Sequence, residues 1–348
     1  MSVRQPSCNP SYLPTQQTAR ALSLNLAESR SLPSSLPAEL SSANPHPPIQ
    51  TETRFKGNPL AIVLIPHGQD PATETLQTLA HEFNLSETVF LYLPSPTNPD
   101  PSPTPSWRAR IFTTASELPF AGHPAIGTAC YALRTLSPAP SGTLHLPAGP
   151  VPISLTPSGA AARASVPHAL HLHTETPFSL ADVEALQPAL RAHRVRAIDV
   201  VSPVRGMNFA CVELEGLEAL GAVGCNGVKP AVRLDREWDV GFVGALFYVV
   251  LGVEDVEGGG RRVQVRTRMI EGAFEDAATG SAACALAGFL ALKGGVRRVE
   301  FEVVQGVEMG RRSEIGVVVG LTEGLDGLES LELSGSAVRV MEGKVVVE

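Results

Sequence analysis

A long uncharged apolar run, residues 282–292, constrains the fold of this chain more than any other stretch. Alanine and leucine dominate the run and both favour helix, so the sequence predicts a helix that is buried on all sides. Strand-like residues 263–270 lead into it, and the polar residues Asp276, Thr279 and Ser281 come between. The first turn of the helix therefore directs free backbone N–H groups and a positive dipole end into a polar loop. Such a loop suits a bound anion, for example a substrate carboxylate.

The same plan occurs earlier in the chain, in residues 117–133. An acidic residue is again followed by a glycine, a polar side chain and an apolar helix, with Gly122 and His123 in the places of Gly280 and Ser281. Two such units predict two similar halves whose helix N-termini face each other across a cleft. The alternative is one buried helix in each of two ordinary domains, with glycine serving only as a turn residue.

Composition limits the partners of the chain. A length of 348 residues suffices for two domains, and the net charge of −8 argues against nucleic acid or an anionic membrane as the main partner. No apolar run reaches the roughly 18–20 residues that a membrane-spanning helix needs. The five cysteines are odd in number and show no C-x-x-C spacing. They predict a reducing, cytoplasmic location with neither disulfides nor zinc.

The domain boundaries follow changes in composition. Residues 1–50 are rich in serine and proline and are predicted to be disordered, with a short helix at 21–26 as the one element they could form. Their arginine and serine content also fits a transit peptide. Residues 51–160 and 161–335 form the two predicted domains, and the last strand, 336–348, can complete the first of them.

Glu87 is the candidate acid/base. Apolar spacing predicts a helix that ends near Phe83, and an apolar strand starts at Val89, so Ser86 and Glu87 lie at the junction. The strand would draw Glu87 toward the interior, where a carboxylate has a raised pKa and can exchange protons near neutral pH. The alternative is an ordinary surface carboxylate.

Other chemistry finds little support. The chain has no dinucleotide or Walker loop, no His-Glu-x-x-His and no Gly-x-Ser-x-Gly motif. His168, His171 and His173 are close in sequence, but they lie in a linker-like stretch without carboxylate or thiol partners, so no metal site is predicted there. Without cofactor motifs, acid–base chemistry on a small molecule is the default for an enzyme.

Five motifs then match one known family in order and at sensible spacing. They are Gly57-Asn58-Pro59, NLSETVF at 84–90, ELPFAGHP at 117–124, EDAATGSA at 275–282 and QGVEMGR at 305–311. Together they resemble the phenazine-biosynthesis isomerase-like family, whose fold is related to diaminopimelate epimerase. The resemblance implies an α/β (α+β) fold of two similar domains, each a curled mixed sheet around a central apolar helix. It also implies an active site between the domains, no cofactor and commonly a homodimer.

The resemblance also implies roles for particular residues. Glu87 matches the family's acid/base, which moves a proton between carbons of an unsaturated or hydroxylated acid. The other matching positions are His123, Asp276 and Ser281 as further catalytic residues, and Ser86, Gly122, Thr279 and Gly280 as substrate-binding residues. The implied function is therefore a cofactor-independent isomerase acting on a small carboxylate metabolite. A non-catalytic metabolite-binding protein and a racemase that uses a carboxylate are the alternatives.

This chain departs from the family pattern in three places. Ala277 and Arg312 stand where the family usually has proline. The first strand, normally found just before the Gly57 turn, is replaced by the proline-rich residues 44–51, and prolines cannot donate to a sheet. The first strand is therefore expected to be missing or altered. In the related epimerases two cysteines move the proton, but Ala121 and Thr279 occupy those places here, which disfavours cysteine-based racemisation.

Overall fold

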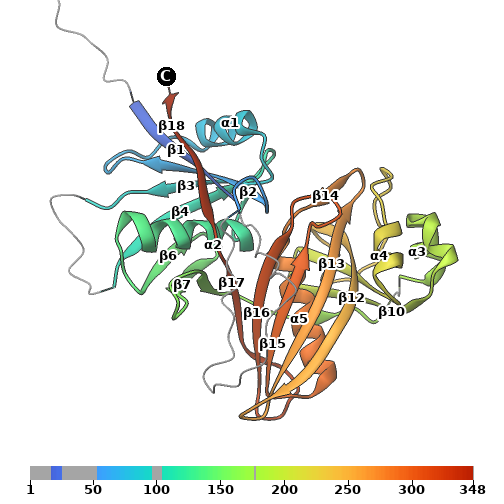
Figure 1. Cartoon of the computed structure of the whole chain (residues 1–348). Helices are drawn as coiled ribbons and strands as arrows, with labels where there is room; N and C mark the ends of the chain where they lie inside the picture. Colours follow the sequence, from blue (N-terminus) through green and yellow to red (C-terminus); the bar gives the residue numbers. More distant parts are fainter. Residues whose placement is uncertain (1–16, 26–52, 96–103, 176–177, 348) are drawn as a thin grey trace, which may run out of the picture.

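The computed structural model describes residues 17–25, 53–95, 104–175 and 178–347 as a mixed α/β fold (Figure 1). The helices are α1 (Thr73–Phe83), α2 (Gly122–Tyr131), α3 (Leu180–Leu186), α4 (Leu217–Ala222) and α5 (Gly280–Gly294), with a π-helical turn at Ala132–Leu136 and a 3-10 turn at Pro188–Ala192. The first strands are β1 (Gln17–Asn25), β2 (Pro59–Ile65), β3 (Thr88–Tyr92), β4 (Ser106–Phe112), β5 (Glu117–Leu118), β6 (Ser141–Leu146), β7 (Gly149–Leu155) and β8 (Ala162–Ser165). The later strands are β9 (His171–Leu172), β10 (Val195–Val204), β11 (Met207–Leu214), β12 (Phe242–Val256), β13 (Gly260–Glu271), β14 (Phe274–Asp276), β15 (Arg298–Gln305), β16 (Ser313–Leu321), β17 (Leu328–Gly335) and β18 (Val338–Val347). The predicted α/β class is confirmed.

The two halves of the chain repeat one order of elements. The first runs β1-β2-α1-β3-β4-β5-α2-β6-β7-β8, and the second runs β10-β11-α4-β12-β13-β14-α5-β15-β16-β17. Parallel strands need a crossover, and in each half two parallel pairs are joined by a helix. These pairs are β2 with β3, β4 with β6, β11 with β12, and β13 with β15. The predicted likeness of the two halves therefore extends through their whole strand pairing.

Helices α2 and α5 form the centre of the two halves. Every residue of α2 is buried, and α5 is buried without a break from Ala282 to Phe289. Helix α2 packs against β2, β3, β7, β8 and β17, while α5 packs against β10, β11, β15, β16 and β17. The alanine, glycine and cysteine side chains of both helices are small, so the surrounding strands can approach from several sides. The two apolar helices are thus enclosed as the sequence predicts.

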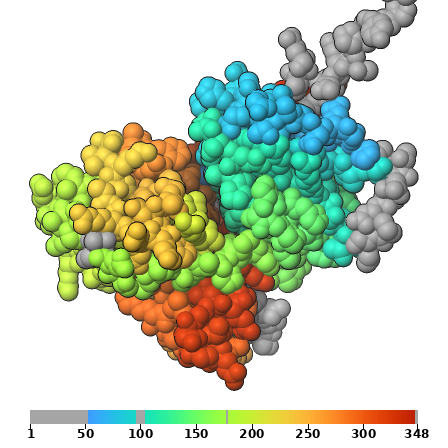
Figure 2. Space-filling model, turned by 180° about the vertical axis from the view of Figure 1, so that it is seen from behind, coloured from blue at the N-terminus to red at the C-terminus, as the bar shows by residue number. Residues whose placement is uncertain are grey.

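The halves join where these two helices begin. Strand β8 pairs antiparallel with β17, with Ala164 opposite Leu333. A Cβ added to Gly280 would lie 3.1 Å from Gly122 Cα, and one added to Gly122 would lie 3.0 Å from Gly280 Cα. Only glycine permits such an approach, so the helix starts adjoin directly. Figure 2 shows a furrow on the outside between the half coloured blue to teal and the part coloured yellow to orange.

The first strand differs from the prediction. No structure beyond a short helix was expected before Thr51, but Gln17–Asn25 forms strand β1, paired antiparallel with both β2 and β18. Arg20 lies opposite Leu64 of β2 and opposite Lys344 of β18. The strand expected to be missing or altered is therefore supplied by an earlier segment, because an unpaired edge of β2 can accept any extended chain of suitable length. The rest of the predicted disordered stretch, residues 1–16 and 26–50, lies outside the described residues.

The structure contains no helix that is both long and apolar enough to cross a membrane, among the residues that it describes.

Candidate active site

Glu87 lies where α1 gives way to β3. Helix α1 ends at Phe83, and Asn84 adopts the left-handed conformation with φ of 50°, which turns the chain toward the sheet. The next strand begins at Thr88 and is buried between β2 and β4. Glu87 is drawn inward with it, and its side chain is only 18% exposed. Burial raises the pKa of Glu87, and a hydrogen bond with Ser86 opposes this rise in pKa only in part.

His123, in the first turn of α2, faces this carboxylate. Its side chain is 6% exposed, and its Nε2 lies 3.5 Å from Glu87 Oε2. Both atoms are buried, and neither has a hydrogen-bond partner within the described part of the chain. Burial lowers the pKa of His123 to about 4, so the ring is neutral at physiological pH.

Asn58 connects the two halves of the site. Its Nδ2 donates to Asp276 Oδ1 at 2.7 Å and lies 3.2 Å from the carbonyl oxygen of Ala278. The same nitrogen lies 3.4 Å from His123 Nδ1. The amide has only two protons, which the shorter contacts to Asp276 and Ala278 can use, but an amide nitrogen does not accept, so the Nδ1 lone pair of His123 faces it. The network therefore assigns the proton of the neutral ring to Nε2, the nitrogen that faces Glu87.

Asp276 is held by a second set of hydrogen bonds. Thr279 Oγ1 donates to Asp276 Oδ2 at 2.6 Å. Gln305 Nε2 donates both to Thr279 Oγ1 at 2.9 Å and to the backbone oxygen of Asp276 at 2.8 Å, and this fixes the direction of the threonine proton. Burial, assisted by the nearby Glu87 carboxyl, raises the pKa of Asp276 to about 6, although the hydrogen bond from Thr279 favours the charged form. A carboxyl group in this state can exist in both protonation states near neutral pH.

The two helix starts supply backbone donors beside these side chains. Neither α2 nor α5 has a side-chain cap, so the first-turn N–H groups around Gly122 and Gly280 are left for another acceptor. Ser281 lies in the first turn of α5 and is partly exposed. No hydrogen bond joins Ser281 to the Asn58–Asp276 network among the described residues.

The predicted residues therefore separate into three groups. Glu87, His123, Asp276 and Thr279 come together with Ser86, whose Oγ lies 3.5 Å from Asn58 Oδ1. Gly122 and Gly280 adjoin each other, and Ser281 follows Gly280 in the chain but lies outside the network. The fold thus brings five of the eight candidate residues into one buried network.

Sequence reasoning gave no site role to two buried residues, Asn58 and Gln305. Both lie within the matched motifs, where Asn58 reads as part of a tight turn and Gln305 as the end of a strand. A signal did exist, since each is an amide next to a glycine at the edge of a buried strand. Their exposures of 3% and 1% require fully satisfied amides, which only the folded network reveals.

Comparison with known proteins first defines the class. A Bacillus anthracis phenazine biosynthesis protein of the PhzF family has the same fold, with a TM-score of 0.67 at 20% identity, covering 95% of this chain and 99% of that one. A probable proline racemase from Agrobacterium radiobacter also matches, with a TM-score of 0.53 at 14% identity over 95% and 93% of the two chains. The chain thus has the two-domain fold of diaminopimelate epimerase-like proteins, as predicted.

The family follows from sequence. The profile of the family described as "Phenazine biosynthesis-like protein" matches residues 49–343, so the chain belongs to this family. An uncharacterized isomerase of Mesorhizobium japonicum is 32% identical over 314 residues, which are 85% of this chain and 96% of the relative. The trans-2,3-dihydro-3-hydroxyanthranilate isomerase of Pseudomonas chlororaphis is 31% identical over 302 residues, 84% of this chain and 95% of that enzyme. The predicted resemblance is confirmed.

Proposed function

We propose that this protein is an isomerase that moves a proton between carbons of a small carboxylate metabolite without a cofactor, and that Glu87 is its general acid/base. The observation that carries the proposal is the pair of buried atoms Glu87 Oε2 and His123 Nε2, 3.5 Å apart and without other partners among the described residues. Buried polar atoms are normally hydrogen-bonded, so an unsatisfied pair points to a ligand or a reacting proton.

Each part of the site has a place in the reaction. Glu87 takes a proton from one carbon of the substrate and returns it to another, and its raised pKa brings proton donation within reach near neutral pH. The first-turn N–H groups of α2 and α5 hold the substrate carboxylate and the enolate-like charge that develops when the proton leaves. Neutral His123 presents its Nε2–H to Glu87, while Asn58 and Thr279 keep Asp276 in place.

Proton exchange in heavy water tests this function. The first compound to try is trans-2,3-dihydro-3-hydroxyanthranilate, the compound named for the Pseudomonas relatives, followed by other unsaturated and β-hydroxy acids. We expect deuterium incorporation at carbon, measured by NMR, and a loss of about 100-fold or more in rate for Glu87→Gln. Glu82→Gln changes an exposed glutamate of α1 and is the matched control, expected to leave the rate unchanged.

Three results would contradict the proposal. Exchange that persists in Glu87→Gln at the wild-type rate excludes Glu87 as the acid/base. If the wild-type protein binds these acids, seen as a rise in melting temperature, but exchanges no proton, the chain is a metabolite-binding protein instead. Loss of optical rotation without a change in double-bond position would indicate a racemase.

A further inference from the structure

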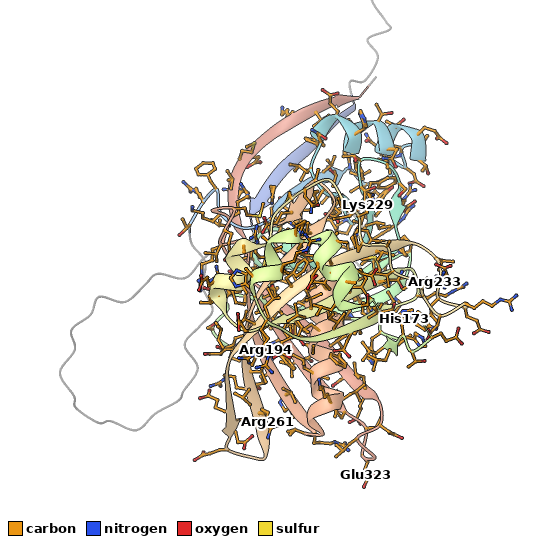
Figure 3. All side chains as sticks on the ribbon, turned by 90° about the vertical axis from the view of Figure 1, so that its right-hand side faces the viewer. His173, Arg194, Lys229, Arg233, Arg261 and Glu323 are labelled. Atoms are coloured by element: carbon orange, nitrogen blue, oxygen red, sulfur yellow. The ribbon has the colours of Figure 1, made fainter. Side chains whose placement is uncertain are left out.

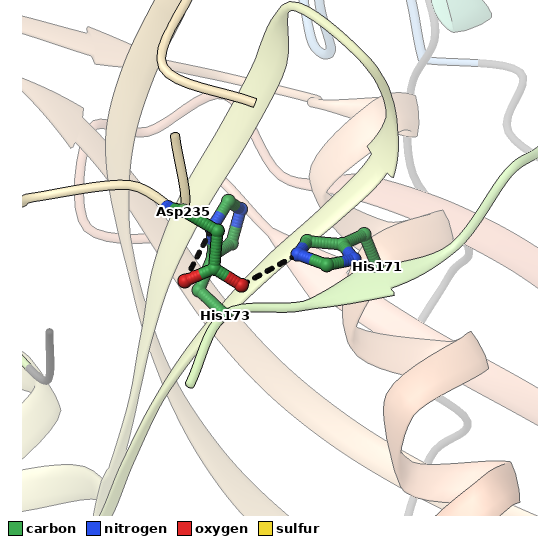
Figure 4. A group of neighbouring side chains, drawn as sticks. All are labelled: His171, His173 and Asp235. Carbon is green, nitrogen blue, oxygen red and sulfur yellow. Dashed lines mark hydrogen bonds and ion pairs between the residues drawn. The ribbon is translucent and has the colours of Figure 1, made fainter. Parts of the chain in front are cut away.

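Two histidines and an aspartate meet at a second place in the fold, shown in Figure 4. His171 lies in β9, His173 follows directly after it, and Asp235 belongs to the coil of residues 223–241 between α4 and β12. His171 Nε2 lies 2.8 Å from Asp235 Oδ2, and His173 Nδ1 lies 3.8 Å from Asp235 Oδ1. One ligand atom from each of the three residues lies within 4.8 Å of the other two. No metal site was predicted here from the sequence, and the carboxylate that meets the two histidines is Asp235, which lies 62 residues beyond His173 in the chain.

The protonation of His173 follows from a chain of hydrogen bonds. Asn208 donates both protons of its amide nitrogen to two backbone carbonyls at 2.9 and 2.8 Å, so its Oδ1 is the atom that accepts from Ser202 Oγ at 2.6 Å. Ser202 has then used its only proton and accepts from His173 Nε2 at 2.8 Å. His173 therefore carries its proton on Nε2 and turns the Nδ1 lone pair toward Asp235. Metal-ligating histidines are oriented by this kind of partner on the second ring nitrogen.

The other two residues are also held in place. The ring of His171 stacks on Trp238, with centroids 4.4 Å apart and an interplanar angle of 6°. The carboxylate of Asp235 accepts the backbone N–H groups of Thr174 and Glu175 at 3.0 to 3.3 Å. Both side chains are thus ordered before any ligand arrives, which lowers the entropic cost of binding.

We propose that His171, His173 and Asp235 bind a divalent transition-metal ion of the zinc type, through His171 Nε2, His173 Nδ1 and a carboxylate oxygen, with water as a fourth ligand. Two imidazole nitrogens and one carboxylate suit zinc or cobalt far better than magnesium or calcium. The ion binds the lone pair of His171 Nε2, so the neutral ring then carries its single proton on Nδ1; a ring protonated on both nitrogens releases the Nε2 proton to solvent. At His173 the ion replaces the backbone N–H of Asp235, which donates to Nδ1 at 3.1 Å. Zinc bonds of about 2.0–2.1 Å place tetrahedral ligand atoms about 3.3 Å apart, so the pair at 2.8 Å opens and the pair at 3.8 Å closes by about half an ångström each. All three ligand atoms, now within 4.8 Å of one another, draw together to that spacing.

The ion would tether a coil whose other end contacts the turn that leads to Asp276. At its other end the coil donates from Gly227 N to the Gly272 carbonyl at 3.2 Å, and Lys229 pairs with Glu271 at 2.7 Å. These contacts lie on the turn from β13 to β14, the strand that ends in Asp276. In Figure 3 the labelled Lys229 and His173 mark the two ends of this connection. Metal binding is therefore expected to stabilise the coil and the turn it touches.

Zinc titration of the full chain tests the site. After treatment with EDTA and its removal, the protein should bind about one Zn²⁺ per chain by calorimetry, with a matching rise in melting temperature. His171→Phe keeps a ring to stack on Trp238 but removes the ligand nitrogen, and Asp235→Asn removes the charge. Removing a residue that only hydrogen-bonds to a metal ligand already weakens metal binding about 10- to 100-fold. Each variant removes a ligand itself, so each should weaken zinc binding by at least that much. His145→Ala, at an exposed site on β6, is the matched control and should leave the affinity unchanged.

A cobalt spectrum separates this site from the exposed thiol of Cys225. Co²⁺ bound to nitrogen and oxygen gives weak visible bands without the intense near-ultraviolet thiolate band, and we expect that spectrum in the wild type and its loss in His171→Phe. A thiolate band, or equal zinc affinity in the wild type and both variants, places the ion elsewhere and overturns the proposal. The wild type could bind no zinc, while His171→Phe still has a lower melting temperature than the wild type in EDTA. In that case the three residues only stabilise the fold by hydrogen bonds, and the metal proposal is wrong. Glu87→Gln should bind zinc as the wild type does, so failure of the proposed isomerase function leaves this result unaffected.

Discussion

Replacing Gly280 with alanine tests the contact between the two helix starts directly. The new Cβ would lie 3.1 Å from Gly122 Cα and 2.8 Å from Leu333 Cδ2. Non-bonded carbon atoms pack at about 3.5–4.0 Å, so one helix must withdraw by several tenths of an ångström. Each helix is enclosed by its own strands and has little room to move. Overpacking of this kind costs about 1–3 kcal/mol in the free energy of unfolding.

A matched glycine-to-alanine substitution elsewhere in the chain should raise the free energy of unfolding instead of lowering it. A Cβ on Gly221, in helix α4, would meet no atom within 4 Å, so Gly221→Ala should stabilise the protein by about 0.5–1 kcal/mol. Urea unfolding followed by tryptophan fluorescence measures both changes. If Gly280→Ala is as stable as the wild type, or gains stability as Gly221→Ala does, the two helix starts do not meet as described.

Three further changes test the charged network and the first strand. Burial raises the pKa of Asp276 from its usual 3.8 to about 6, so this group adds stability below about pH 4 that is lost as pH rises through about 6. Asp276→Asn should remove that pH dependence from urea unfolding curves, and an unchanged slope across this window would contradict it. Glu275→Gln breaks the buried ion pair with Arg268, which has two hydrogen bonds, and should lower the free energy of unfolding by about 3–5 kcal/mol. Glu117→Gln, in the more exposed pair with Arg110, should lower it by about 1 kcal/mol. Equal losses would show that burial does not determine the cost of breaking such a pair. Ala21→Pro places a proline in β1, which pairs with a strand on each side, and should lower the free energy of unfolding by about 3 kcal/mol or more, measured by thermal or urea unfolding. Ala72→Pro is the control, because Ala72 already has a φ of −58°, and it should have little effect. If Ala21→Pro is as stable as the wild type, the β1 pairing is excluded.

The sequence sufficed for the parts of the fold that depend on local pattern. The alanine-rich run at 282–292 predicts a buried helix, and helix α5 indeed extends from Gly280 to Gly294. The junction at Glu87 is also local, because α1 ends on Asn84 and an apolar strand follows. Strand β1 could not be predicted in this way. Its place is set by the unpaired backbone of β2 and β18, a requirement that no residue between Gln17 and Asn25 displays.

The candidate site also combines residues that local sequence indicates with residues whose part depends on contacts across the fold. Glu87 could be chosen as a candidate acid/base from its neighbours in the chain, and His123 and Asp276 became candidates through the family resemblance. The roles of Asn58 and Gln305 depend on distances across the fold, since Asn58 bonds a residue 218 positions away. The cluster of His171 and Asp235 was missed for the same reason. An amide or a carboxylate carries no sequence mark of the partner that folding brings to it.

The repeat also explains why the proposed chemistry needs a single acid/base. Glu275 pairs with Arg268 in the second half as Glu117 pairs with Arg110 in the first, so the two halves keep the same framework of charges around their helix starts. The residue just before β3 is Glu87, but the residue just before β12 is Gly241. A side chain at Gly241 would run into the Gly206 carbonyl at 2.2 Å, so the second half has no room for an equivalent carboxylate there. The first half thus holds Glu87, the proposed proton carrier, while Asp276 comes from the second half, with Asn58 of the first half bonded to it. This asymmetry favours transfer of a proton between two carbons by one group over racemisation by two opposed bases.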